Sequence, residues 1–107
     1  MTRIDESIKT RLLSIARSAI AAHLSGCADP LEATTMPTMV HGGVFITLRR
    51  LGQLRGCLGP FASTGDLLTT IRRMAVSAAH DPRFVDLPLS LAELSELRIE
   101  ISLLSPV

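Results

Sequence analysis

The sequence predicts an α+β domain in which a mostly antiparallel sheet packs against two main helices. Two segments, residues 3–24 and 66–80, repeat their apolar residues at helical spacing. Residues 44–50 and 54–58 have strand character and are separated by a short turn, while residues 97–104 form a third, alternating segment. Because a hairpin followed by a helix and a third strand builds a layered sheet, this order indicates one domain of the α+β class.

The first predicted element is an amphipathic helix over residues 3–24. Its apolar stripe is wide and aliphatic, so we expect it to pack on the sheet or on the second helix. Thr2 is the predicted N-cap, and Gly26 is predicted to end the helix. Residues 25–43 then form a long loop with several prolines and glycines, and loops of this length are usually functional or mobile.

A β-hairpin is predicted after the loop. Its strands are residues 44–50 and 54–58, and Leu51, Gly52 and Gln53 form a tight turn in which the glycine takes a positive φ. Alternation within the first strand places its apolar residues on one face. This face is expected to form part of the core.

The remaining elements are a second helix, a short helical turn and a last strand. The second helix is predicted over residues 66–80, with Thr64 or Asp66 as its N-cap. An S-x-x-E capping box predicts a short helical turn over residues 90–95. The strand over residues 97–104 alternates apolar and polar side chains, so it is expected to bury one face.

Composition and charge exclude several classes of function. The chain has 107 residues, of which 47% are hydrophobic and 20% charged, so it is globular rather than disordered. Aromatic residues make up only 3%, which argues against platforms that stack nucleic-acid bases. The net charge is +1, but residues 41–83 hold six arginines against two aspartates, a local charge of +4. We expect these arginines to form local ion pairs on a solvated face. The alternative is an anionic-ligand or nucleic-acid-related role through Arg49, Arg50, Arg55, Arg72 and Arg73.

The cysteines and the hydropathy pattern indicate a reduced, cytoplasmic protein. Cys27 and Cys57 fit neither a C-x-x-C redox motif nor a zinc motif. No apolar run is long enough to span a membrane, and the N-terminus lacks the form of a signal peptide. We therefore predict no metal, no cofactor and no membrane association.

The segment from Leu54 to Gly59 is the first candidate site. Alternation along a strand puts Arg55 and Cys57 on one face, about 7 Å apart. A nearby guanidinium favours the reactive thiolate, and the glycines Gly56 and Gly59 leave space around the sulfur. The segment therefore suits a nucleophilic, ligand-binding or metal-binding cysteine. A small, buried and inert cysteine is the other interpretation, and the residues alone favour it.

A nucleophilic cysteine would need a base, and the chain has three histidines. His41 lies just before the first strand, so it is the candidate that could approach the hairpin. His23 is expected at the surface of the first helix, and His80 at the end of the second. No spacing among them specifies a catalytic triad.

The segment from His80 to Phe84 is a second cluster of interest. Asp81 is expected to cap or turn the chain, and Arg83 to pair with it or with the end of a helix. Phe84 is expected to insert into the core. On the residues alone, a rigid exit from the second helix is the favoured interpretation.

Four ordered segments resemble the AMMECR1 domain family. They are residues 43–48, 54–59, 81–84 and 100–106, and the R-G-C-L-G stretch within the second is the most specific. The resemblance implies an α+β fold with helices around an antiparallel sheet, and an activity that is not established. It also implies a motif at Arg55, Gly56, Cys57 and Gly59 and a secondary motif at Asp81, Pro82, Arg83 and Phe84. From these motifs, the predicted ligand-binding residues are Arg55, Gly56, Cys57, Gly59, Asp81 and Arg83.

The same resemblance implies that residues 1–107 are the amino-terminal part of one AMMECR1 domain, because family domains run to nearly twice this length. The carboxyl-terminal part, with more strands and a helix, is then missing. An exposed sheet edge would favour a homodimer or low stability. In bacteria and archaea such proteins are called AmmeMemoRadiSam system protein A, which implies a Memo-like or radical-SAM protein as a partner.

We therefore expect a binding or accessory module that uses the R-G-C-L-G hairpin as a site for a small ligand or a partner protein. The alternative is an enzyme in which Cys57 is the nucleophile or redox centre, assisted by Arg55 and by His41. A nucleic-acid-related role through the basic middle segment is the third and weakest hypothesis.

Overall fold

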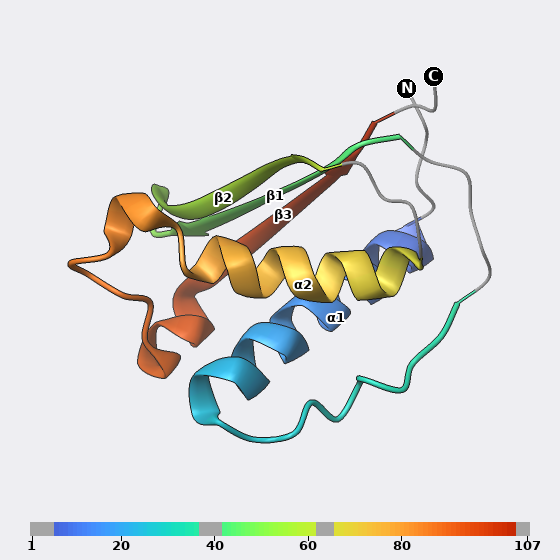
Figure 1. Cartoon of the computed structure of the whole chain (residues 1–107), viewed down its shortest axis with the longest axis horizontal. Coiled ribbons are helices and arrows are strands. Elements are labelled where there is room, and N and C mark those ends of the chain that lie inside the picture. The colour runs from blue at the N-terminus through green and yellow to red at the C-terminus, as the bar shows by residue number, and fades with distance from the viewer. Residues whose placement is uncertain (1–5, 37–41, 62–65, 105–107) are drawn as a thin grey trace.

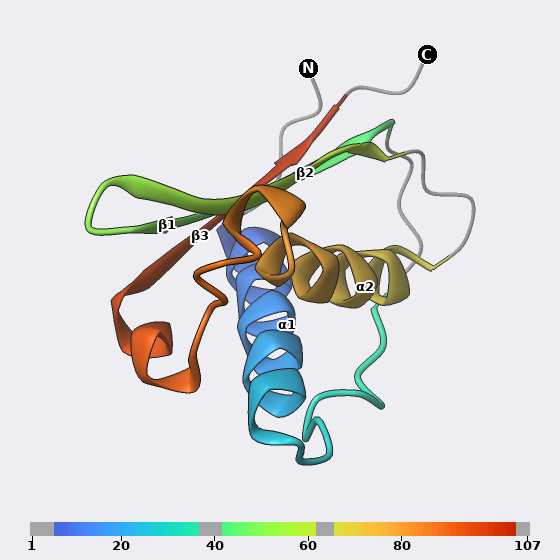
Figure 2. The same cartoon turned by 60° about the vertical axis from the view of Figure 1, so that its left-hand side comes forward.

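Three antiparallel strands form the sheet of the protein, in the order β2-β1-β3. The computed structural model describes residues 6–36, 42–61 and 66–104. The central strand β1 (Val44–Arg50) pairs with β2 (Gln53–Phe61) on one side and with β3 (Leu97–Leu103) on the other. The α1 helix (Glu6–Ser25) and the α2 helix (Leu67–Ala79) cover one face of this sheet (Figure 1). The predicted α+β architecture is confirmed, and Figure 2 shows its two layers from the side.

Both helices end within one residue of the predicted positions, α1 at Ser25 and α2 at Ala79. In α1, the residue after the last turn is Gly26, whose φ of 71° lies in the left-handed region that favours glycine. Thr2, its predicted N-cap, lies outside the described residues. Asp66 caps α2 by accepting the backbone N–H of Thr69 at 3.0 Å, as one of the two predicted caps.

The β1–β2 turn is tighter than the sequence predicts. Arg50 pairs with Gln53, so only Leu51 and Gly52 form the loop, with φ values of 52° and 82°. Two successive positive φ values characterise a type I′ turn, whose twist matches that of the flanking strands. Leu51 is therefore a non-glycine residue in the left-handed region.

Strand β2 is longer than predicted, because it extends from Gln53 to Phe61 rather than from residue 54 to residue 58. Its pairing with β1 shifts register twice, between Leu48 and Arg49 and between Val44 and Ile46. Such bulges insert residues without ending the pairing. They also interrupt the simple two-residue alternation on which the sequence prediction depended.

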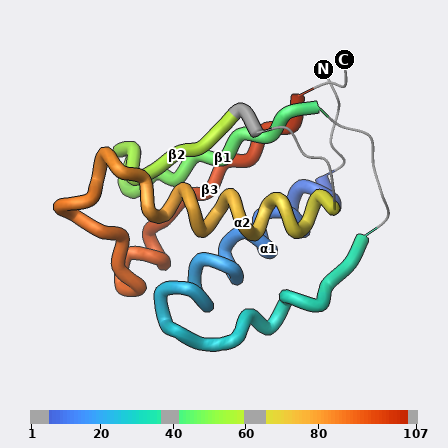
Figure 3. The backbone as a smooth tube through the Cα atoms, in the orientation of Figure 1, coloured from blue at the N-terminus to red at the C-terminus, as the bar shows by residue number. Residues whose placement is uncertain are grey.

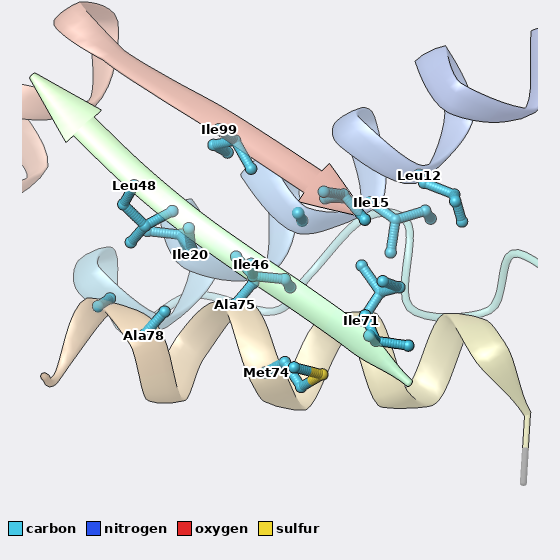
Figure 4. Close-up of a cluster of buried hydrophobic side chains, with 14 of the residues drawn as sticks. Leu12, Ile15, Ile20, Ile46, Leu48, Ile71, Met74, Ala75, Ala78 and Ile99 are labelled. Carbon is cyan, nitrogen blue, oxygen red and sulfur yellow. The ribbon is translucent and has the colours of Figure 1, made fainter. Parts of the chain in front are cut away.

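The core is aliphatic, as the composition predicts. Buried side chains of both helices meet the apolar face of β1 and β3, and Figure 4 shows this contact around Ile46, Ile71 and Met74. Burying a large aliphatic side chain contributes about 1.5–3 kcal/mol, so the contacts of these side chains between the two helices and the sheet stabilise the fold.

Two arginines of the helices donate hydrogen bonds to backbone carbonyls of segments distant in the sequence. Arg17 of α1 donates to the carbonyl oxygens of Leu94 and Leu97 at 2.8 and 2.6 Å. Arg72 of α2 donates to the carbonyl oxygens of Leu31 and Thr34, both at 3.0 Å. The first part of the predicted loop over residues 25–43 is therefore anchored to α2, while His41 lies outside the described residues.

The connection from α2 to β3 contains two short 3-10 helices, η1 (Pro82–Phe84) and η2 (Leu91–Glu96). The predicted turn over residues 90–95 is confirmed as η2, where the Ser90 N–H donates to the Glu93 carboxylate at 2.8 Å. η2 lies near the β1–β2 turn (Figure 3), and Arg50 beside that turn pairs with Glu96 at 3.0 Å. β3 ends at Leu103, one residue earlier than predicted.

Candidate functional site

Gly56 lets the end of α2 lie directly against β2. A Cβ added at this position would overlap the carbonyl oxygen of Ala78 and would lie 3.0 Å from its carbonyl carbon and 3.5 Å from the Asp81 Cβ. The nearest atoms belong to backbone and cannot rotate away. This glycine is therefore required by close packing between a helix end and a strand.

Gly59 is required for a different reason. Its φ of 139° is one that other residues rarely adopt, and a Cβ there would lie 2.7 Å from the Phe45 Cδ1 and 2.8 Å from the Val44 oxygen. Both motif glycines thus have structural roles. In the sequence these glycines stand out by the space they leave around Cys57 and by their place in the R-G-C-L-G motif, whereas the structure places neighbouring backbone close to each of them.

Arg55 is buried and pairs with Glu93 rather than lying beside Cys57. Its Nη2 lies 3.0 Å from the Glu93 Oε2, and its side chain is only 8% exposed. Burial raises the pKa of Glu93, but the Ser90 N–H and the positive charges of Arg55 and Arg50 outweigh it, so the pKa is lowered overall. Arg55 is expected from the sequence to lie beside Cys57, but its guanidinium is directed to Glu93 instead. Arg55 occupies the bulge of β2, where the register shift removes it from simple alternation.

The guanidinium at Cys57 belongs to Arg83 of η1. Its Nη2 donates to the Cys57 Sγ at 2.8 Å, across 26 residues of sequence. We call Cys57, Arg83 and the carboxylate that joins them, Asp81, the Cys57–Arg83 site. Cys57 is half-buried, while the side chain of Arg83 is 57% exposed, so the site opens to solvent.

Asp81 holds this site together. Its Oδ2 accepts the Cys57 backbone N–H at 3.1 Å and the Arg83 Nη2 at 2.7 Å, and its Oδ1 accepts the Arg83 backbone N–H and Nε at 2.9 and 3.1 Å. The side chain of Arg83, followed by its backbone N–H, holds the pKa of Asp81 well below its usual range. In return, Asp81 and then the Cys57 sulfur raise the pKa of Arg83. The predicted turn-capping role of Asp81 and its pairing with Arg83 are both present.

Phe84 lies beside two guanidinium groups instead of inserting into the core. The Arg55 Cζ lies 5.6 Å from the centre of its ring, and the Arg83 Cζ lies 5.8 Å from it. The Phe84 ring therefore contacts one arginine of the Arg55–Glu93 ion pair and one arginine of the Cys57–Arg83 site. A pocket of about 400 Å³ adjoins this region and is lined in part by His80, Asp81 and Phe84.

The site has a sulfur, a fixed positive charge and a carboxylate that is a poor base. A carboxylate with a strongly lowered pKa has little tendency to take up a proton from a thiol. His41, the predicted base, lies outside the described residues, so the structure does not place it. Among the residues that the structure describes, no group of three or more potential metal ligands exists.

The basic middle segment is largely neutralised by local partners, as expected. Arg49 lies 3.5 Å from Glu100, and Arg50 contacts Glu93 and Glu96 at 3.4 and 3.0 Å. Arg72 is held by the backbone carbonyls described above. Neither described helix has the length and apolar character needed to cross a bilayer.

The structure joins two segments that the sequence analysis treated separately. Cys57 and Asp81 are 24 residues apart and meet because α2 returns the chain to β2. Nothing in their spacing predicts this contact, and the roles of Arg83 at the sulfur and of Glu93 at Arg55 were missed for the same reason.

The comparisons with known proteins agree with the four segments. The AMMECR1 family matches residues 13–107. The chain belongs to this family. It is similar to a protein of Methanothermobacter thermautotrophicus, with 38% identity over 98 residues that cover 89% of this chain and 50% of that protein. Protein TK0174 of Thermococcus kodakarensis is 33% identical over 114 residues, which cover 99% of this chain and 55% of that protein.

A solved structure has a similar fold. The crystal structure of uncharacterized protein PH0010 from Pyrococcus horikoshii matches with a TM-score of 0.75 and 31% identity, over 96% of this chain and 54% of that chain. The chain thus spans about half the length of the curated relatives that it matches. Family membership and fold are established by these similarities, whereas the names of the relatives give no activity.

Proposed function

We propose that this AMMECR1 protein is a cytoplasmic binding or accessory module of the AmmeMemoRadiSam system, and that it docks a ligand or partner at the Cys57–Arg83 site. The observation that carries the proposal is the 2.8 Å contact between the Arg83 Nη2 and the Cys57 Sγ at the surface. The other motif residues, Arg55, Gly56 and Gly59, support this pair through packing and a buried ion pair. Cys57 of the R-G-C-L-G motif and Arg83 of η1 therefore present one sulfur and one cation at the surface.

Binding is favoured over catalysis because Asp81, the carboxylate that contacts both Cys57 and Arg83, is a poor proton acceptor. The four hydrogen bonds that Asp81 accepts stabilise its ionised form. The Nε and Nη2 of Arg83 donate to Asp81 and Cys57, which leaves its Nη1 to donate to a carboxylate or phosphate of a partner.

The test measures binding of this chain to a Memo-like protein by calorimetry. Replacing Arg83 by alanine is expected to weaken binding at least about tenfold, because hydrogen bonds to charged groups contribute about 1.5–3 kcal/mol. Arg98→Ala is the matched control, since this arginine is more exposed and pairs only weakly on β3. Equal affinity for the wild type and Arg83→Ala would reject the site. Absence of binding to both Memo-like and radical-SAM proteins would reject these partners.

An enzyme with Cys57 as its nucleophile is the second candidate, because the guanidinium contact at the sulfur favours a thiolate. The test follows the rate of Cys57 alkylation against pH in a Cys27→Ser background, which removes the exposed second cysteine. The enzyme hypothesis predicts a reactive species well below pH 8, and a shift to higher pH in Arg83→Gln but not in Arg98→Gln. A profile like that of a free thiol, about 8.5, or no labelling of the folded protein, would reject it.

A nucleic-acid-related role receives less support from the structure. Of the five arginines that would carry it, Arg49, Arg50 and Arg55 are paired with glutamates. Arg72 donates to backbone carbonyls, and Arg73 is exposed on α2. A binding constant that does not fall with added salt would exclude contacts between these arginines and phosphates.

A further inference from the structure

Two histidines from different helices meet at the surface. His23 lies in the last turn of α1, and His80 is the C-cap of α2, 57 residues further along the chain. Their Nε2 atoms are 2.7 Å apart, and their rings are nearly perpendicular, with 4.8 Å between ring centres. Both side chains are exposed. Neither the family match nor the proposed function involves this pair.

The geometry requires a hydrogen atom or a cation between the two nitrogens. Each neutral imidazole has one ring nitrogen with a lone pair, and two such lone pairs repel when they face each other. The repulsion is absent when one neutral ring carries its hydrogen on Nε2 and donates it to the Nε2 lone pair of the other ring. A metal ion bound to both lone pairs also removes it. Two nitrogens at about 2.0 Å from one metal and at a right angle to each other lie about 2.8 Å apart. The separation of His23 and His80 matches this value more closely than the wider spacing of a tetrahedral site.

We propose that His23 and His80 form a two-ligand site for a divalent transition metal of the nickel or copper type. Imidazole nitrogen is a preferred ligand of these ions, and adjacent positions at right angles are typical of their coordination. Both histidines also lie at the C-terminal ends of helices, where the partial negative charge of the unpaired carbonyls favours a cation. The sequence-based prediction of no metal depended on linear motifs, and this pair has none.

The remaining coordination positions of the site are open to solvent. Because the described residues contain no group of three or more potential ligands, water or a donor atom of a bound molecule completes the coordination. His80 also borders the pocket next to Asp81, so a molecule bound there can reach the metal. A metal that joins His23 to His80 would link α1 to α2 and stabilise their contact.

The experiment titrates the complete chain with Ni²⁺ near neutral pH by calorimetry and records thermal unfolding in parallel. The wild type is expected to bind one equivalent and to gain in melting temperature, because a ligand that binds only the folded state stabilises it. His23→Gln and His80→Gln are each expected to weaken binding at least tenfold. His41→Gln changes the remaining histidine and is the matched control, and Cys27→Ser tests the exposed thiol that follows α1.

Ni²⁺ binding is expected to be weakened in His23→Gln and in His80→Gln. It is expected to be unchanged in the controls His41→Gln and Cys27→Ser. Binding that survives in His23→Gln or His80→Gln, or that disappears in Cys27→Ser or His41→Gln, would place the metal elsewhere and overturn the proposal. No binding by the folded wild type would also overturn it. Because both histidines are exposed, folding of the variants is expected, and circular dichroism without metal checks it. A second readout is the broadening of amide resonances by paramagnetic Ni²⁺, which should begin around residues 23 and 80.

Discussion

Replacing Gly56 by alanine is expected to destabilise the protein by about 3 kcal/mol. The new Cβ would overlap the carbonyl oxygen of Ala78, with the carbonyl carbon only 3.0 Å away. Overpacking of an interior costs about 1–3 kcal/mol, and the upper end applies because the obstacle is backbone. The end of α2 would have to move away from β2, and Asp81, 3.5 Å from the same Cβ, would move with it.

The assay is urea unfolding followed by circular dichroism, with Gly26→Ala as the matched control. A Cβ at Gly26 meets open space, but its φ of 71° is unfavourable for alanine, which costs about 1 kcal/mol. We therefore expect Gly56→Ala to be less stable than Gly26→Ala by about 2 kcal/mol. In a domain of this size each kcal/mol lowers the melting temperature by roughly 4–8 °C. Equal stability of the two variants would refute the argument that a steric approach of α2 requires this glycine.

Four further outcomes are expected. Leu51→Gly should raise the free energy of unfolding by about 0.5–1 kcal/mol in urea titrations, because this residue has a φ of 52° in a type I′ turn and its side chain is largely exposed. Glu93→Ala should cost about 3 kcal/mol, since it leaves the buried Arg55 unpaired, whereas Glu100→Ala on the exposed face should cost less than about 1 kcal/mol. The lowered pKa of Asp81 contributes stability that is present above its unfolded pKa of about 3.9 and is lost as the pH falls through the folded pKa, so unfolding measured between pH 7 and pH 2 should depend less on pH in Asp81→Asn. The outer edge of β3 has no strand partner among the described residues and predicts a homodimer. Analytical ultracentrifugation should detect it as mass that increases with concentration, and the mass of one chain at every concentration would contradict it.

Local patterns were sufficient for most of the secondary structure. The end of α1 at Gly26, the cap of α2 at Asp66 and the short turn that became η2 depend on residues close in sequence, so the sequence predicts them. The extent of β2 was not predictable in this way. Its bulges depend on pairing with β1, and a register shift leaves no local signal in the sequence.

The sequence by itself determined the fold class, the aliphatic core and the segment that carries the site, because hydrophobic periodicity and turn residues act locally. Only the tertiary structure decided which arginine contacts the Cys57 sulfur. Alternation pointed to Arg55, but a bulge and the buried carboxylate of Glu93 direct that side chain inward. Arg83 reaches the sulfur instead, since the close approach of α2 to Gly56 brings η1 beside β2. Contacts between distant segments depend on how the helices pack on the sheet. The spacing of residues along the sequence does not predict this packing.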